Sequence, residues 1–263
     1  MDFDKKAMAD MNIKDSLMLL MIVAMSIMAC GSKPNAKDAV LSKNKANQYI
    51  EQGRCDKAIK ELHNVLKADE KDAGSYRLMA ECFEKLGLPD SAIIYYEGAI
   101  VFQPDDREAY EHIADIYYES GDYHEAMAWY DRALQISYIS SSSFTRLGII
   151  HQSWHEYNLA GTYYHYAIAM DSSNSNALYG LGDIDLQQGD TASAIILFEK
   201  AVETGQNVGA AYDLAVIMQK RELYDEAISW LDKCIEFSDD PKFKEQIYQL
   251  KMGIIVKMKA GQK

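Results

Sequence analysis

A period of 34 residues runs through most of the chain and constrains its fold more than any other feature. Small residues recur at this spacing, at Ala58, Ala92, Ala126, Ala160 and Ala194, and Ala227 follows 33 residues later. A bulky residue stands four positions after each of them, and another small residue follows three positions later in most repeats. The i, i+4, i+7 spacing marks one face of an α-helix, and small residues there let a second helix approach closely. Because one helical hairpin cannot bury its apolar face alone, the hairpins must stack on their neighbours.

A second column of the repeat predicts where each hairpin turns. Five positions before the first small residue stand Gly53, Gly87, Gly121 and Gly189, with His155 and Glu222 as departures. Glycine is favoured where a left-handed backbone residue ends a helix. The pattern therefore predicts two helices in each repeat, joined at this column.

These columns resemble the tetratricopeptide repeat family, whose helix-turn-helix unit has 34 residues. The second repeat carries the pattern most fully, in Tyr76, Ala80, Phe83, Gly87, Ala92, Tyr96, Ala99 and Pro104. The resemblance implies an all-α fold, a right-handed superhelical solenoid of about six repeats whose concave face is lined by the first helix of each repeat. The repeats are predicted at 39–72, 73–106, 107–140, 141–174, 175–207 and 208–241, followed by a solvating capping helix over 242–263.

The first thirty residues indicate export. Residues 16–30 form an uncharged apolar run that is short for a bilayer span but has the length of a signal-peptide core. Ile27-Met28-Ala29-Cys30 resembles the lipobox of bacterial lipoproteins, which implies cleavage after Ala29 and lipidation of Cys30. We therefore expect a signal peptide over 1–29 and a lipidated tether over 30–38. The implied location is the bacterial cell envelope, at the outer membrane facing the periplasm, with a non-cleaved anchor or a buried helix as the alternative.

Composition and motifs exclude several classes of function. The formal net charge of −13 argues against a nucleic-acid binder, which needs a basic surface to neutralise phosphates. Cys55, Cys82 and Cys234 are odd in number and lack metal or redox spacing, so we expect no disulfide framework. His151 and His155 are four residues apart, but they occupy a packing column and the turn column. We therefore predict no metal site, no cofactor, no small-molecule substrate and no catalytic activity.

The resemblance also implies which side chains line the concave groove. On the first helices these are Lys43, Asn47, Arg77, Glu81, Glu84, Glu108, Glu111, Asp115, Tyr118, Gln152, Tyr179, Asp183, Tyr212 and Gln219, with Thr145, Ile149, Asn176, Leu186 and Val216 on the same face. Lys43 and Asn47 match part of the clamp by which some relatives hold a chaperone C-terminus. The rest of that clamp is missing, because Leu78, Glu108 and His112 stand at its other positions.

Five acidic residues of this set suggest a partner with a basic segment, although a solvated surface is an equal alternative. They are Glu81, Glu84, Glu108, Glu111 and Asp115. We predict a non-catalytic, membrane-anchored scaffold that holds a peptide segment or partner protein during assembly of envelope complexes. The alternatives are a binding subunit for cell-wall enzymes or glycans and a cargo-capture lipoprotein displayed on the cell surface.

Overall fold

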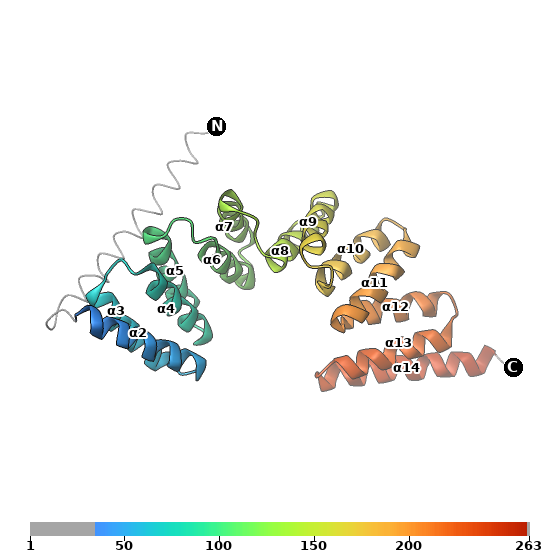
Figure 1. The fold of residues 1–263 in the computed structure, drawn as a ribbon. Coiled ribbons are helices and arrows are strands. Elements are labelled where there is room, and N and C mark those ends of the chain that lie inside the picture. Colours follow the sequence, from blue (N-terminus) through green and yellow to red (C-terminus); the bar gives the residue numbers. More distant parts are fainter. Residues whose placement is uncertain (1–34, 262–263) are drawn as a thin grey trace. The chain divides into compact units, whose positions relative to one another are not determined.

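The computed structural model describes residues 35–261, which are helical and contain no strand (Figure 1). The predicted signal peptide and the lipobox at Cys30 lie outside the described residues. Within the described range, no helix is both long and apolar enough to cross a membrane. The all-α prediction is confirmed.

The chain divides into two compact units between Ile139 and Ser140. Unit 1 contains α2 (Ala36–Glu51), α3 (Cys55–Ala68), α4 (Ala73–Lys85), α5 (Pro89–Phe102), α6 (Arg107–Ser120) and α7 (Tyr123–Ile136). Unit 2 contains α8 (Ser141–Ser153), α9 (Tyr157–Met170), α10 (Ser175–Gln187), α11 (Thr191–Gly205), α12 (Val208–Lys220), α13 (Tyr224–Phe237) and α14 (Pro241–Gly261). In both units, successive helices pair as hairpins and each hairpin packs on the next.

The predicted turn column adopts left-handed backbone at every hairpin. The φ angles are 70° at Gly53, 70° at Gly87, 85° at Gly121 and 89° at Gly189. The two departures from glycine share this geometry, with φ of 61° at His155 and 63° at Glu222. Residues with a Cβ rarely occupy this region, so these two turns hold local strain.

Polar caps fix where the first helix of each hairpin begins. The Asp72 side chain accepts a hydrogen bond from the Ser75 backbone N–H at the start of α4. Asp106, Ser140, Asn174 and Asn207 cap α6, α8, α10 and α12 in the same way. A side chain at this position satisfies one of the backbone donors that a helix leaves unpaired.

The predicted small and bulky columns form the core between the helices. The six alanines at Ala58, Ala92, Ala126, Ala160, Ala194 and Ala227 are all 0% exposed. The large rings that follow them, Tyr96, Tyr130, Tyr164 and Phe198, are also 0% exposed. Full burial of an aromatic side chain contributes about 1.5–3 kcal/mol, so this column is a main source of stability.

Glycines on the first helices of unit 2 let two neighbouring helices close on one ring. A Cβ added at Gly148 in α8 would lie 2.5 Å from the Tyr164 ring, and one at Gly180 in α10 would lie 2.4 Å from it. Such distances are far below van der Waals contact, so only glycine fits at these two positions. The Tyr164 ring therefore lies between the backbones of α8 and α10.

The last helix covers the end of unit 2, although its outer face is less polar than the sequence suggests. Ile247 and Ile254 of α14 are buried against the preceding hairpin. On the outer side, Tyr248, Met252 and Val256 are 49%, 55% and 63% exposed. The expectation of a solvating end helix is therefore met only in part, because an apolar stripe follows three turns of the exposed face.

Candidate functional site

In unit 1, the groove residues form a network of ion pairs between α4 and α6. Arg77 Nη1 of α4 lies 2.7 Å from Glu108 Oε2 and 3.6 Å from Asp106 Oδ1. Arg107 pairs with Glu111, one turn further along α6, and lies 3.8 Å from Glu108. Glu111 is only 6% exposed, so its side chain lies inside the protein rather than on its surface. The carboxylates here are already paired with arginines of the same chain.

The other carboxylates of unit 1 bind side chains that come from the second helices or from the next hairpin. Glu84 accepts a hydrogen bond from the Tyr96 hydroxyl and lies 3.3 Å from His112 Nδ1. The His112 ring stacks on Tyr96 with a centroid distance of 5.0 Å, and its bond to Glu84 raises the pKa of the imidazole. Asp115 accepts from the Tyr130 hydroxyl. Two tyrosines of the buried column thus bond their hydroxyl groups to carboxylates of the first helices.

The remaining predicted residues of unit 1 lie on α2, α4 and α6, and Glu81 lies 4.0 Å from Arg77 Nε. Lys43 Nζ of α2 bonds Asp72 Oδ2 at 2.6 Å and so ties the first hairpin to the start of α4. Asn47 is exposed one turn further along. Tyr118 packs against Tyr123 with a centroid distance of 5.6 Å.

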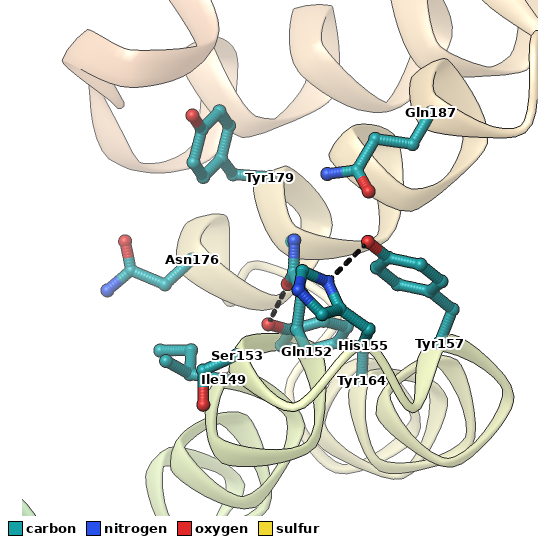
Figure 2. A pocket seen from close by; sticks show the side chains of 10 residues that line it. Ile149, Gln152, Ser153, His155, Tyr157, Tyr164, Asn176, Tyr179 and Gln187 are labelled. Carbon is teal, nitrogen blue, oxygen red and sulfur yellow. Dashed lines mark hydrogen bonds between the residues drawn. The ribbon is translucent and has the colours of Figure 1, made fainter.

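Unit 2 contains a pocket of about 510 Å³ between α8, the α8–α9 turn, α9 and α10 (Figure 2). It is lined by Ile149, Gln152, Ser153, His155, Tyr157, Tyr164, Asn176, Tyr179, Gly180 and Gln187. The family pattern placed four of these on the groove face: Ile149, Gln152, Asn176 and Tyr179. It did not indicate the others, of which Tyr164 belongs to the core column and His155 to the turn column.

Hydrogen bonds fix Gln152 in the centre of this unit 2 pocket. Its Oε1 accepts from the Tyr164 hydroxyl at 2.6 Å, and its Nε2 donates to Asp183 Oδ2 at 2.5 Å. Gln187 Nε2 donates to the same Asp183 oxygen at 2.8 Å. Burial raises the pKa of Asp183, and the two amide donors partly offset this effect. These hydrogen bonds therefore hold the Gln152 amide in one orientation within the pocket.

Two polar atoms at opposite ends of α10 remain unused by the described residues. Asn176 Oδ1 accepts from Asn207 Nδ2 at 3.1 Å, which leaves its own Nδ2 group as a donor. Gln187 uses its Nε2 on Asp183, which leaves Oε1 as an acceptor. Figure 2 shows Asn176 and Tyr179 on one side of the pocket and Gln187 on the other.

Other residues predicted to line the groove lie along α12, beside a second, smaller pocket. The Tyr179 hydroxyl donates to Asp213 Oδ2 at 3.1 Å, and burial raises the pKa of both groups. Tyr212 is 37% exposed, and Gln219 is half-buried. The second pocket has a volume of about 370 Å³ and is lined by Leu186, Thr191, Asp213, Val216, Ile217, Lys220 and Arg221.

The two histidines that share metal spacing bind different neighbours. His151 is buried, its Nδ1 lies 2.6 Å from Glu156 Oε2, and its ring stacks on Tyr163. His155 Nδ1 lies 2.9 Å from the Tyr157 hydroxyl. No cluster of three or more potential metal ligands occurs among residues 35–261.

Stacked hairpins that present variable polar side chains on their first helices define a helical-repeat binding scaffold. Tetratricopeptide repeat models match residues 43–106, 107–138 and 147–208, more than half of the 263 residues. The chain belongs to the tetratricopeptide repeat family. No curated protein matches the sequence.

Several solved structures have the same fold as this chain. The pilF protein of Pseudomonas aeruginosa has a TM-score of 0.67 at 16% identity, covering 82% of this chain and 98% of its own. PilW, described as a widely conserved type IV pilus biogenesis factor, has a TM-score of 0.63 at 17% identity, covering 80% and 98%. YrrB, described as having an unusual peptide-binding site, has a TM-score of 0.56 at 20% identity, covering 72% and 97%. At these identities the similarity shows the fold alone.

Proposed function

We propose that this protein is a non-catalytic scaffold that holds an extended segment of a partner protein in the unit 2 pocket. We further propose that it does so as a lipid-anchored protein of the bacterial cell envelope, facing the periplasm, during the assembly of envelope complexes. The observation that carries the binding proposal is the pocket itself, which combines apolar walls with polar groups that the described residues leave unused. Pockets of this kind are typical binding sites.

The spacing of the unused groups matches a stretch of extended peptide. Gln187 follows Asn176 by 11 residues in α10, which corresponds to about 16 Å along the helix axis. An extended chain covers this distance in about five residues. Asn176 Nδ2 would donate to a backbone carbonyl at one end, and Gln187 Oε1 would accept a backbone N–H at the other.

The walls between these two groups favour an uncharged anchor side chain. Ile149 and Tyr157 supply apolar surface, and Gly180 adds no side chain to the floor, beneath which the Tyr164 ring is fully buried. The lining contains no carboxylate, lysine or arginine. A charged side chain placed here would lose its hydration without gaining a partner. We therefore expect an aliphatic or aromatic residue of the partner to fill the pocket.

Backbone strain supports a functional role for the same pocket. His155 lines it from a left-handed conformation, whereas Gly53, Gly87, Gly121 and Gly189 occupy the corresponding turns without strain. Strain of this kind concentrates at functional sites, where the side chain compensates for its cost. The His155 ring contacts Tyr157 and extends the aromatic wall of the pocket.

A random-peptide display library panned against the full chain tests the binding proposal. We expect enrichment of sequences with a central uncharged anchor, and loss of this enrichment in the double variant Asn176→Ala, Gln187→Ala. Asn64→Ala with Gln135→Ala is the matched control, because both are exposed amides on second helices of unit 1. Equal enrichment by the wild type and the double variant would exclude the pocket as the binding site.

A basic portion of the partner is proposed for the acidic cluster of unit 1. The cluster carries more carboxylates than cations, and the Glu108 side chain is 59% exposed while that of Glu81 is 31% exposed. Glu111 and Asp115 are poor choices for a test. Glu111 is buried against Arg107 and Asp115 is bonded to Tyr130, so reversing their charge would disturb the fold.

The test therefore uses Glu81→Lys with Glu108→Lys and a fluorescent deca-lysine peptide. We expect weaker binding in this double variant than in the control Glu203→Lys, Glu226→Lys, which changes two exposed residues of second helices by the same net charge. Equal weakening in both variants would indicate that the peptide is attracted by total charge alone. It would exclude the acidic cluster of unit 1 as the binding site for a basic segment.

The envelope location is supported by the Ile27-Met28-Ala29-Cys30 motif. A neighbour of the same fold is a type IV pilus biogenesis factor by its description. Metabolic labelling with an alkyne fatty acid should mark the wild type and leave Cys30→Ala unlabelled. Labelling of both forms, or of neither, would contradict the proposal of a lipid anchor at Cys30.

Glycan binding has less support than protein binding. Tyr179 is half-buried, and its hydroxyl is bonded to Asp213, so its ring is not open for stacking on a sugar.

A further inference from the structure

Two cysteines from neighbouring hairpins meet in the core of unit 1. Cys55 is the first residue of α3 and is 3% exposed, and Cys82 lies in α4 and is 1% exposed. Together with Ala58 they form one small core cluster, closed by Tyr49 and Ile50. The two thiols are thus side by side across the contact between the first and second hairpins.

Comparison among the repeats shows that Cys82 departs from its column, whereas Cys55 belongs to a column with no single residue type. At the 34-residue spacing, Cys82 corresponds to Ile116, Ile150 and Ile184. Cys55 corresponds to Pro89, Tyr123, Tyr157 and Thr191. Ile116, Ile150 and Ile184 are all buried, so an ordinary packing role at this column is served by isoleucine. Cys82 departs from isoleucine, and it lies in the same core cluster as Cys55.

Cys234 provides an internal comparison within the same chain. It is 0% exposed in α13, it belongs to the core of unit 2, and its Sγ lies 3.8 Å from the Val208 carbonyl oxygen. No second cysteine shares that core cluster. Cys234 is therefore a small buried hydrophobe, whereas Cys55 and Cys82 have a partner of the right chemistry.

We propose that Cys55 and Cys82 form a disulfide bond when the protein folds in an oxidising compartment. The Sγ–Sγ bond forms as the two thiols lose two electrons and two protons to a small disulfide oxidant, which is released as two thiols. Burial and the neighbouring Cys55 raise the pKa of Cys82 to about 12, so little thiolate is present once the pair is enclosed. The bond therefore forms most readily while the hairpins are still assembling.

The bond would secure the most weakly held end of unit 1. Ala46 is the one residue of α2 that is fully buried, and Val40 and Leu41 on the same helix are 62% and 53% exposed. Fewer buried contacts lower the free energy needed for a terminal element to open. A bond between α3 and α4 holds the first hairpin on the second and restricts the unfolded chain over the loop that it closes.

Peptide mapping of the full chain tests the proposal directly. The protein is recovered from a bacterial periplasm, alkylated in denaturant without reduction and cleaved with trypsin. We expect the peptides CDK (55–57) and LMAECFEK (78–85) as one disulfide-linked species, and CIEFSDDPK (234–242) alkylated at Cys234 as the internal control. A second sample, unfolded and reduced in denaturant and then refolded with oxidised glutathione, tests the pair independently of cellular location. Alkylation of both Cys55 and Cys82 in both samples would overturn the proposal.

Thermal unfolding with and without reductant tests the role of the bond. We expect reduction to lower the midpoint for loss of helix in the wild type by about 5 °C or more. The double variant Cys55→Ala, Cys82→Ala should show no response to reductant, and Cys234→Ala should respond like the wild type. An unchanged midpoint in linked wild-type protein after reduction would refute the stabilising role.

Discussion

His155 offers a test in which stability and binding should change in opposite directions. Its backbone has a φ of 61°, and its side chain lines the unit 2 pocket. Replacing it with glycine keeps the turn and removes the side chain. If the strain is retained because the side chain binds a partner, His155→Gly should stabilise the chain and weaken peptide binding. Glu222 has the same geometry, with a φ of 63°, and does not line the pocket.

The magnitude follows from three terms. A residue with a Cβ in the left-handed region costs about 1–2 kcal/mol relative to its preferred conformations. Glycine loses about 0.4–1 kcal/mol more backbone entropy on folding, which offsets part of the gain. The exposed contact between His155 Nδ1 and the Tyr157 hydroxyl is also lost. We expect His155→Gly to raise the free energy of unfolding by about 0.5 kcal/mol, or Tm by about 1–2 °C.

The assay pairs thermal unfolding by circular dichroism with binding of a peptide selected from the display library. His155→Gly should unfold slightly later than the wild type and bind the peptide at least about threefold more weakly, a loss of about 0.6 kcal/mol. Glu222→Gly should gain similar stability and bind normally. Two results would refute the reasoning: a lower midpoint for His155→Gly, or the same affinity in all three proteins.

Other perturbations test the packing and the electrostatics of unit 2. Gly180→Ala places a Cβ 2.4 Å from the Tyr164 ring. The resulting overpacking costs about 1–3 kcal/mol, which exceeds the gain of about 1 kcal/mol in helix propensity. The denaturant concentration at the midpoint of unfolding should therefore fall. Gly253→Ala in α14 meets nothing within 4 Å and should instead stabilise by up to about 1 kcal/mol. Burial raises the folded-state pKa of Asp213 above 3.8, so its contribution to stability is fully present below pH 3.8 and is lost as pH rises through the raised value. Asp213→Asn keeps an acceptor for the Tyr179 hydroxyl and should flatten the profile of Tm against pH across this window.

The helical hairpins were predictable because their determinants are local and periodic. The spacing of alanines such as Ala92 and Ala126 sets a helical face, and the column of Gly87 and Gly121 sets the turns. The structure adds that His155 takes the glycine conformation without being glycine. The glycine column predicts the backbone geometry of the turn. It does not predict whether another residue in that column keeps this geometry under strain or forms a different turn.

The binding surfaces were predictable only in part, because hydrogen bonding depends on which columns meet in space. The mapping placed Gln152 and Tyr179 on the face that forms the pocket, yet Tyr164 and Gln187 were not indicated. The unit 1 carboxylates were grouped together, but the hydroxyl that reaches Glu84 comes from a residue assigned to the core. A one-dimensional pattern assigns each residue to the core or the surface, whereas a tyrosine can belong to both.

The tyrosine column has a consequence for how such a scaffold changes its ligand during evolution. Tyr96, Tyr130 and Tyr164 fill the core with their rings and each donates a hydrogen bond to a side chain of a first helix, while Phe198 fills the same place without a hydroxyl. Exchange between the two residue types alters a single oxygen atom and leaves the packing volume almost unchanged. One conservative mutation inside a hairpin can therefore release a first-helix side chain such as Gln152 to bond a partner, with no change to any surface residue.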